Sequence, residues 1–408
     1  MQRVIIIGGG AAGFFAAISC ASASPKTEVI LLEAARKPLA KVRISGGGRC
    51  NVTHHCFDPA LLIQAYPRGG KALRGAFTRF QPQDTIAWFE KRGVELKTEA
   101  DGRIFPVTDN SETIINCLVS EAKNQGVIIK TGVKVQWLSY ENEQFVVELK
   151  NGESLRSDRA LLATGSQRIA YQWAKQFGHK IIPPIPSLFT FNINDERLND
   201  LAGITVEQVE IQLQLKGKEK YKQTGQLLIT HWGISGPAVL KLSSYGARVI
   251  HDQSYYLGIL INWLPSENME TIKEKLFAQK QENPRRQVMS FSPFPIPRRL
   301  WEKLATVAGI SPTLRWAEIS KKQVKALAKE LTQGEFQMEG KGVFKEEFVT
   351  CGGIDLKGIN FKTMESKFIS GLYFAGEILD IDGITGGFNF QSAWTTGWLA
   401  GQGMSNEI

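Results

Sequence analysis

The chain has 408 residues with 49 Lys and Arg against 40 Asp and Glu, which gives a formal net charge of +9. This length is typical of about two to three domains with full hydrophobic cores, so no disulfide or structural metal is needed for stability. The five scattered cysteines argue against a secreted disulfide framework and favour a reducing cytoplasm. No apolar run reaches the roughly 18 residues of a membrane span, so we expect no membrane partner.

The chain begins with the pattern of a βαβ unit. Val4–Ile7 and Glu28–Glu33 are short continuous apolar runs, as expected of buried parallel strands, and Ala11–Ala23 is rich in small residues that suit a helix. The motif Gly8-x-Gly10-x-x-Gly13 lies between the first strand and the helix. This is the context that a dinucleotide-binding motif requires.

Each part of this motif has a physical role. Gly8 permits a tight turn, Gly10 lets the backbone approach a pyrophosphate, and Gly13 lets the helix pack closely on the strand. The helix N-terminus favours the phosphate charge. Glu33 ends the second strand, where its carboxylate would accept hydrogen bonds from ribose hydroxyls. An acidic residue here suits FAD or NAD and opposes the 2′-phosphate of NADP.

The next part of the chain alternates between helical and strand-like patterns. Helices are predicted over about Gln83–Arg92 and Ser111–Gln125, the second capped by Asp109 or Asn110. From Val127 to Ala163 the pattern is that of strands, with Asn151-Gly152 as a two-residue hairpin turn. A buried strand over residues 158–164 ends at Gly165.

The middle of the chain is predicted to be an insertion. Ile181–Pro186 breaks the pattern, short strand-like runs follow to about Ile261, and the period is helical from about Ser266 to Gln333. Ser320 has the sequence of a capping box that opens a helix. From about residue 343 the strand–turn–helix pattern returns.

Three further segments fit a flavin site. Residues 41–53 carry three glycines flanked by Arg49 and Asn51, and the backbone N–H groups of these glycines could wrap a dinucleotide. The second segment is Ala163-Thr164-Gly165, at the end of a strand. In the third, Gly376-Glu377 follows a strand, and residues 386–389 open a helix whose amides could face the flavin. Each segment alone also fits an ordinary surface loop or a strand–loop–helix unit.

Together these segments resemble the flavoprotein family that includes aminoacetone oxidase-like proteins and the BaiN-type bile-acid reductases. The resemblance extends over nearly the whole chain. It is carried by GGGAAG from Gly8, SGGGRCN from Ser45, THWGISGPAVLKLS from Thr230, CGGI from Cys351, TMESK from Thr363, GLYFAGEILD from Gly371 and GGFNFQSAW from Gly386.

The resemblance implies an α/β fold: a Rossmann-like FAD-binding domain of the glutathione-reductase type, interrupted by two inserts. The expected segments are residues 1–187 and 341–408 for the FAD-binding domain, 188–262 for a β-rich insert and 263–340 for a helical insert. It also implies bound FAD, with Glu377 on the ribityl chain and Val133 reaching the adenine through its backbone. The predicted cofactor-binding residues, from motif and resemblance together, are Gly8, Gly10, Ala12, Gly13, Glu33, Lys41, Ser45, Gly46, Gly47, Arg49, Asn51, Val133, Thr164, Gly165, Gly376, Glu377, Gly387, Phe388 and Asn389.

Two departures from the family pattern lie close to these residues. The basic residues that usually precede the SGGG loop are replaced by Ala40-Lys41-Val42, with Arg43 next, so the basic contact is expected to have moved. Ser166 replaces a second glycine after Gly165, and the chain passes almost at once into Ala170-Tyr171-Gln172 in place of a longer Pro- and Gly-rich loop. The substrates of relatives are therefore not carried over to this chain.

Some residues suggest other chemistry. Cys50 and Cys56, with His54 and His55 between them, invite a zinc or redox-disulfide interpretation, but the spacing suits neither, and we expect ordinary thiols and no metal. His231 is interpreted as a structural histidine, and the alternative is an acid or base on the substrate side of the flavin. No catalytic residue is identified.

Three functions follow as hypotheses. The first is an FAD-dependent oxidoreductase that acts on an unidentified small molecule and cycles its flavin by two electrons. No second glycine triad with its own βαβ context is present, so NAD(P)H, if used, would reach the flavin from solution as a transient donor. The second is a flavoprotein that acts on RNA, suggested by basic residues in the middle of the chain. The third is a non-enzymatic flavin-binding sensor or partner module. The basic residues are Lys216, Lys218, Lys220, Lys222, Arg285, Arg286, Arg298, Arg299, Lys321 and Lys322.

Overall fold

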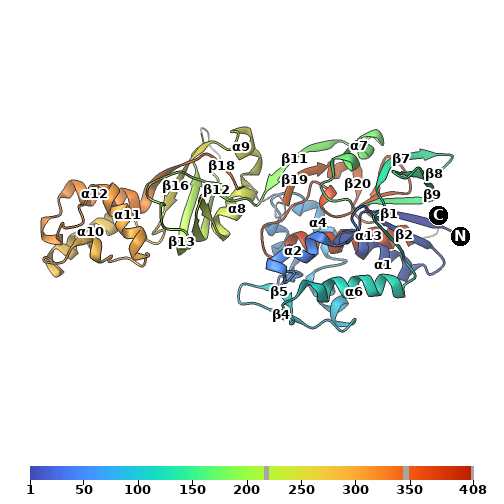
Figure 1. Cartoon of the computed structure of the whole chain (residues 1–408), viewed down its shortest axis with the longest axis horizontal. Coiled ribbons are helices and arrows are strands. Elements are labelled where there is room, and N and C mark those ends of the chain that lie inside the picture. Colours follow the sequence, from blue (N-terminus) through green and yellow to red (C-terminus); the bar gives the residue numbers. More distant parts are fainter. Residues whose placement is uncertain (216–219, 343–348, 406–408) are drawn as a thin grey trace. The chain divides into compact units, whose positions relative to one another are not determined.

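A computed structural model describes residues 1–215, 220–342 and 349–405. The chain folds into two compact units, one formed by residues 1–186 and 349–408 and the other by residues 187–348 (Figure 1). We call them unit 1 and unit 2. Lys216 and Lys218, two of the basic residues noted in the sequence, lie outside the described residues.

Unit 1 is built on a largely parallel sheet with the strand order β20-β21-β22-β10-β1-β2-β6. The strands β6, β2, β1, β10 and β22 run parallel, with Ile6 level with Leu31 on one side and Leu161 on the other. The α/β, Rossmann-like fold expected from the sequence is thereby confirmed. The strands are β1 (Arg3–Ile7), β2 (Glu28–Glu33), β6 (Ile128–Thr131), β10 (Arg159–Leu162), β20 (Ile359–Asn360), β21 (Glu365–Ser366) and β22 (Leu372–Phe374).

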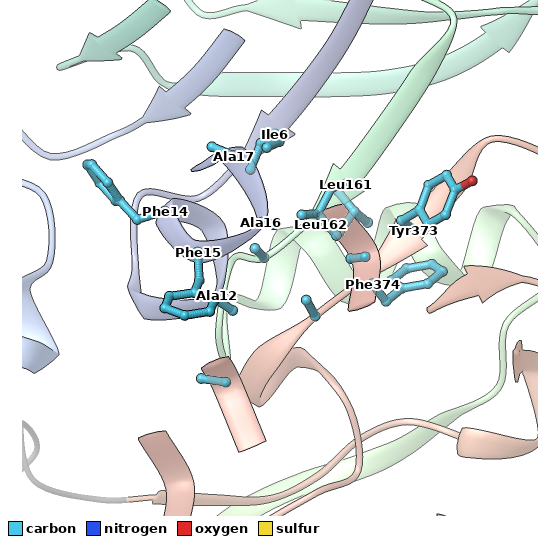
Figure 2. Packing of buried hydrophobic residues seen from close by; sticks show 14 of the residues in the cluster. Ile6, Ala12, Phe14, Phe15, Ala16, Ala17, Leu161, Leu162, Tyr373 and Phe374 are labelled. Carbon is cyan, nitrogen blue, oxygen red and sulfur yellow. The ribbon is translucent and has the colours of Figure 1, made fainter. Parts of the chain in front are cut away.

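Two helices from opposite ends of the chain, α1 (Ala11–Ala23) and α13 (Phe388–Ser405), pack against each other in unit 1. A Cβ atom added at Gly397 of α13 would lie 2.6 Å from the Ala12 carbonyl oxygen, and one at Gly401 would lie 2.6 Å from that of Ala16. Figure 2 shows Ala16 and Phe15 of α1 beside side chains of the neighbouring strands, among them Leu162. The first and last segments of the chain therefore share one core.

Smaller elements surround this core. The three-stranded sheets β3-β5-β4 and β7-β8-β9 and the pair β11-β19 complete the β-structure of unit 1 among the described residues. The elements are α2 (Ala40–Gly48), β3 (Thr53–His54), α3 (Pro59–Leu62), η1 (Ile63–Ala65), α4 (Gly70–Phe77), α5 (Pro82–Glu90), β4 (Leu96–Thr98), β5 (Arg103–Pro106), α6 (Ser111–Asn124), β7 (Val135–Glu141), β8 (Gln144–Leu149), β9 (Ser154–Ser157), α7 (Arg168–Gln176), β11 (Ile181–Ser187), β19 (Val349–Ile354), η4 (Leu356–Gly358) and η5 (Gly376–Ile378).

Several local predictions agree with these elements. The Asn110 side chain caps α6 by accepting a hydrogen bond from the Glu112 amide at 2.9 Å, and Asn151-Gly152 lies between the paired strands β8 and β9. Ile181–Pro186 forms most of strand β11 (Ile181–Ser187), and the first segment of unit 1 ends at Pro186, where the break in the sequence pattern indicates a boundary. Proline is tolerated there because β11 pairs only with β19, and a strand with an unpaired edge can lack a donor.

Unit 2 is a sheet with the order β17-β16-β13-β14-β15-β12-β18 and several helices, and both contribute to one hydrophobic cluster. The residues expected as a helical insert contain α10, α11 and α12 but end in β17 and β18, which return to the sheet. The elements are β12 (Phe191–Asn192), β13 (Thr205–Leu213), β14 (Lys222–Thr230), β15 (Gly233–Ser235), α8 (Pro237–Tyr245), α9 (Ala247–Asp252), β16 (Leu257–Asn262), α10 (Met269–Glu282), η2 (Val288–Ser290), α11 (Arg298–Val307), η3 (Trp316–Glu318), α12 (Lys321–Gln333), β17 (Gly334–Met338) and β18 (Gly340–Lys341).

The capping box at Ser320 is present as predicted. The Ser320 hydroxyl accepts a hydrogen bond from the Gln323 amide at 3.2 Å, and the Gln323 side chain accepts one from the Ser320 amide at 3.0 Å. These reciprocal bonds satisfy two amides at the start of α12, which then buries Val324, Leu327 and Leu331.

Replacement of Gly397 by Ala tests the contact between α1 and α13. The new methyl group would collide with the Ala12 carbonyl, so we expect a loss of about 1–3 kcal/mol of stability, seen as a lower melting temperature by circular dichroism. Gly75→Ala in α4 is the matched control, because no heavy atom lies within 4 Å of the added Cβ; this change should be neutral or stabilise by about 0.4–1 kcal/mol. Equal melting temperatures for Gly397→Ala and the unchanged protein would contradict the close helix contact.

Candidate functional site

The glycine motif forms a tight turn between β1 and α1, and its glycines fall into two kinds. Gly8 has φ +114°, and a Cβ there would lie 2.4 Å from the Ala163 carbonyl oxygen, while one at Gly13 would lie 1.9 Å from that of Gly8. These two are required for packing. At Gly10 no heavy atom lies within 4 Å of an added Cβ, so open space adjoins the backbone at the position assigned to the pyrophosphate.

The start of α1 leaves its first amides available. Gly10 is the N-cap residue and makes no side-chain capping bond, and the first turn carries no acidic residue. The first amides of a helix have no partner within it, and together with the helix dipole they favour an anion. Ala12 lies in this first turn and is 6% exposed.

Glu33 is held rigidly at the end of β2. One carboxylate oxygen accepts a hydrogen bond from the Gly9 amide and the other from the Ala35 amide, both at 2.7 Å. The Val133 amide donates to the Glu33 carbonyl oxygen at 2.9 Å. Glu33 and Val133, which the sequence assigns to the ribose and the adenine, therefore lie side by side at the ends of adjacent strands.

The segment expected as a glycine-rich loop is in part helical. Helix α2 begins at Ala40, and helical geometry is lost at Ser45, Gly46 and Gly47. Gly46, Gly47 and Gly48 have φ values of +58°, +70° and +85°. An added Cβ would lie 2.9 Å from the Phe105 ring at Gly46 and would meet nothing within 4 Å at Gly47. The turn thus offers open backbone at Gly47, as at Gly10.

The basic residues next to this turn have different partners. The Lys41 ammonium contacts a carboxylate oxygen of Glu377, and Arg43 forms an ion pair with Glu112 of α6. The basic group that reaches the predicted ribityl site is therefore Lys41. Arg49 forms ion pairs with Glu99 at 2.6 Å and Asp109 at 3.5 Å.

The Arg49 guanidinium also lies 4.0 Å from the centre of the Phe105 ring. A hydrogen bond to Glu99 is the main reason that the pKa of Arg49 is raised above its ordinary value. In this structure the charge of Arg49 is thus engaged by carboxylates of the chain itself.

Glu377 belongs to a polar group formed by distant segments. Its second carboxylate oxygen accepts a hydrogen bond from the Thr350 amide at 3.1 Å. Gly165, with φ +60°, would place an added Cβ 3.7 Å from the oxygen of Glu377 that Lys41 contacts. Neighbouring Thr164 has a buried hydroxyl oxygen without a hydrogen-bond partner. Residues from four separate parts of the chain therefore meet at Glu377.

The start of α13 is joined to the segment around Asn51. With its amide oriented to satisfy both neighbours, Asn51 accepts a hydrogen bond from the Gly387 amide at 2.9 Å and donates to the Thr53 carbonyl at 3.0 Å. Phe388 stacks on the His54 ring with 4.6 Å between centroids. The Asn389 side chain instead bridges the amide and the carbonyl of Gly383, at 2.8 and 2.9 Å.

Taken together, these residues fit a dinucleotide. All the predicted residues lie in unit 1. Open backbone at Gly10 and Gly47, an uncapped helix N-terminus and a fixed carboxylate at Glu33 match the pyrophosphate and the ribose.

The pairing of Lys41 with Glu377 and the hydrogen bond from the Thr350 amide to Glu377 were not predicted from the sequence. The only signal for either was the displaced basic residue before the SGGG loop.

The thiols near this site are ordinary. Cys50 is buried, and its burial raises the pKa of its thiol to about 12. The pKa of Cys56 is also raised by burial. Both are free thiols. Across residues 1–215, 220–342 and 349–405, no group of three or more His, Cys, Asp or Glu side chains is placed to hold a metal ion.

His231 lies in unit 2, at the turn between β14 and β15, and is exposed. It is therefore not a core histidine. Within the described part of the chain, no helix is long and apolar enough to cross a membrane.

Replacement of Glu33 by Ala should weaken the retention of FAD by at least about tenfold, because each lost charge-assisted hydrogen bond contributes about 1.5–3 kcal/mol. The melting temperature should fall as well, because the Gly9 and Ala35 amides lose their acceptor. Flavin absorbance per protein after gel filtration and thermal unfolding measure the two effects. Glu28→Ala at the other end of β2, where the carboxylate pairs with Arg3, should keep its flavin. Full flavin content in the Glu33→Ala variant would refute the assignment.

Several known proteins resemble this chain over nearly its whole length. Residues 2–403 match the family described as HI0933-like protein Rossmann domain. The chain is 31% identical over 415 residues to the ribosomal RNA dihydrouridine synthase of Escherichia coli (strain K12), covering 98% of each chain. It is 34% identical over 417 residues to the protein of the same name from Haemophilus influenzae, covering 99% of this chain and 98% of that one.

A further relative is the 3-dehydro-bile acid delta(4,6)-reductase of Clostridium scindens, which is 28% identical over 410 residues with 98% of each chain covered. Among solved structures, the 3-ketosteroid-delta4-(5alpha)-dehydrogenase of Rhodococcus jostii RHA1 has a TM-score of 0.53 at 14% identity, over 100% of this chain and 97% of that one. This last similarity supports the fold alone.

The match to the family spans nearly the whole chain. The chain belongs to the HI0933-like Rossmann-domain family.

Proposed function

We propose that this protein reduces a carbon–carbon double bond conjugated to a carbonyl group, with a uracil base of RNA as the first candidate substrate. The names of the full-length relatives carry the proposal. Dihydrouridine is uridine saturated at the C5–C6 bond, which is conjugated to the C4 carbonyl, and a 3-dehydro-Δ4,6 bile acid has double bonds conjugated to its C3 carbonyl. The two substrates differ in size and charge but share this bond.

Saturation of the double bond adds a hydride at one carbon and a proton at the other. Reduced nicotinamide from solution is the proposed source of the hydride and is itself oxidised to NAD(P)+, and water is the proposed source of the proton. Bound FAD supplies the two-electron hydride transfer, and the protein supplies position and electrostatics. Glu33, Lys41 and Glu377 would hold the cofactor, and the first amides of α1 would bind its pyrophosphate.

RNA is the first candidate for two reasons. The two relatives at 31% and 34% identity are both named for ribosomal RNA. The formal net charge is +9, and Lys220, Arg285, Lys321 and Lys322 are exposed in unit 2, where positive charge favours association with a polyanion. A small-molecule enone is the second candidate, favoured by the bile-acid reductase at 28% identity.

A direct test is to incubate the purified flavoprotein anaerobically with NADH or NADPH and one of two acceptors. The acceptors are unmodified ribosomal RNA transcribed in vitro and a 3-keto-Δ4,6 steroid. We expect bleaching of the flavin bands by the nicotinamide, and a mass gain of two hydrogen atoms in a uridine of the RNA, detected by nucleoside mass spectrometry. The same gain in the steroid alone would select the second candidate. A flavin that no donor reduces would overturn the proposal and favour the sensor hypothesis.

Salt dependence separates the two substrates further. If the substrate is RNA, the apparent affinity should fall steeply between about 50 and 200 mM salt, because binding releases counterions from phosphates. Reduction of an uncharged enone by the same preparation should change little over this range. An RNA reaction insensitive to salt would contradict an electrostatic contribution from unit 2.

A further inference from the structure

Positive charge is concentrated in one stretch of unit 2, residues 280–325. This stretch has ten Lys and Arg against three Asp and Glu, so it accounts for most of the net charge of +9 of the whole chain. A surface of this kind favours association with a polyanion. The basic residues are Lys280, Arg285, Arg286, Arg298, Arg299, Lys303, Arg315, Lys321, Lys322 and Lys325, and the acidic residues are Glu282, Glu302 and Glu318.

Hydrogen bonds bring separate parts of this stretch together. The Lys280 ammonium, near the end of α10, donates to the Ile319 carbonyl at 3.2 Å, just before the start of α12. The Gln323 side chain, in the first turn of α12, donates to the Gly309 carbonyl at 2.8 Å, just after the end of α11. Figure 1 shows α10, α11 and α12 grouped together within unit 2. The ends of α10 and α11 and the start of α12 therefore lie close to one another.

Three lysines at the start of α12 are exposed and lie close together on the helix surface. Lys321 and Lys325 are four residues apart, and Lys322 and Lys325 are three apart, so their side chains are neighbours. Val324 and Leu327 lie on the buried side of the same helix. Within the part of the chain that the structure describes, none of the three lysines forms an ion pair.

The carboxylates of the stretch have other partners. Glu302 pairs with Arg298 at 2.8 Å, and Glu282 accepts a hydrogen bond from the Gln279 side chain at 2.7 Å. Glu318 accepts one from the backbone at the start of η3 at 3.1 Å. These acidic residues therefore leave the lysines of α12 without a neutralising group.

The position of these lysines is unfavourable for the helix itself. Like charges three or four residues apart on a helix repel each other. Positive charge in the first turn also opposes the helix dipole, and no acidic residue offsets it there. The capping box already engages the Gln323 amide, so a bound anion would meet the lysine side chains. A polyanion would relieve the repulsion that folding alone leaves in place.

We propose that Lys321, Lys322 and Lys325, with the basic residues around them, form a docking surface for the phosphate backbone of RNA. The inference rests on the proposed RNA substrate and assigns its capture to unit 2. All predicted cofactor-binding residues lie in unit 1, so substrate capture and flavin binding belong to different units. Phosphate contacts carry no sequence information, so this surface holds the RNA without selecting the uridine.

A variant in which Lys321, Lys322 and Lys325 are all replaced by Gln tests the surface. The probe is a fluorescein-labelled fragment of ribosomal RNA transcribed in vitro, and its binding to the holoprotein is followed by fluorescence anisotropy. The dissociation constant should rise at least about tenfold, and the slope of log affinity against log salt should fall by about two to three. The melting temperature should stay equal or rise, because the like charges are removed.

A matched control replaces Lys222, Lys273 and Lys275 by Gln. This variant loses the same net charge, but each of its lysines pairs with a carboxylate in the unchanged protein. It should therefore bind the RNA nearly as well as the unchanged protein does. Both variants should retain as much flavin as the unchanged protein, because neither alters unit 1.

Several results would overturn the proposal. An equal loss of affinity in the two variants would mean that only the total charge matters, and no loss in either would place the RNA elsewhere. Binding of the unchanged protein to phosphatidylserine vesicles but not to RNA would assign the surface to a membrane. RNA that binds as predicted but gains no hydrogen would instead refute the proposed reaction and leave the docking surface supported.

Discussion

The close contact between α1 and α13 is the constraint on which unit 1 depends. Gly397 and Gly401 leave room for the carbonyl groups of Ala12 and Ala16, and no larger side chain fits at either glycine without moving a helix. Because α1 begins at the glycine turn after β1 and α13 begins just after Gly387, this contact holds the two halves of the predicted cofactor site together. Asn51 adds a link, since it joins Gly387 to Thr53.

The parts that local sequence determines were predictable. β1, α1 and β2 follow from apolar runs and from the glycine spacing, and the predicted helix over residues 11–23 agrees with α1 (Ala11–Ala23) at both ends. The caps at Asn110 and Ser320 follow from hydrogen bonds within four residues. The position of Glu33 at the end of β2 was predictable, because it closes the apolar run that forms this strand. In all these cases the determining interaction is close in sequence.

The parts that depend on distant segments were not predictable. Lys41 and Glu377 are far apart in sequence, and nothing in the local pattern of either residue indicates the other. Lys41 and Arg43 lie two residues apart on α2 and therefore point in different directions. Lys41 contacts Glu377, whereas Arg43 pairs with Glu112 of α6. The prolines of β11 suggest a break because the pairing with β19, more than 150 residues later, cannot be seen locally. The contacts that the bound flavin makes with these residues remain predictions.

The split of unit 1 between both ends of the chain has a consequence for its synthesis on the ribosome. Residues 1–186 emerge first but lack β22, which lies beside β10, and α13, which covers α1. More than 200 residues must then be made before those elements are complete, an interval on the order of 10–40 seconds at roughly 5–20 residues per second. Throughout it, the apolar faces of α1 and β10 have no native partner from the C-terminal segment. These faces stay open to non-native contacts during that time, and the residues of the predicted cofactor site come together only near the end of translation.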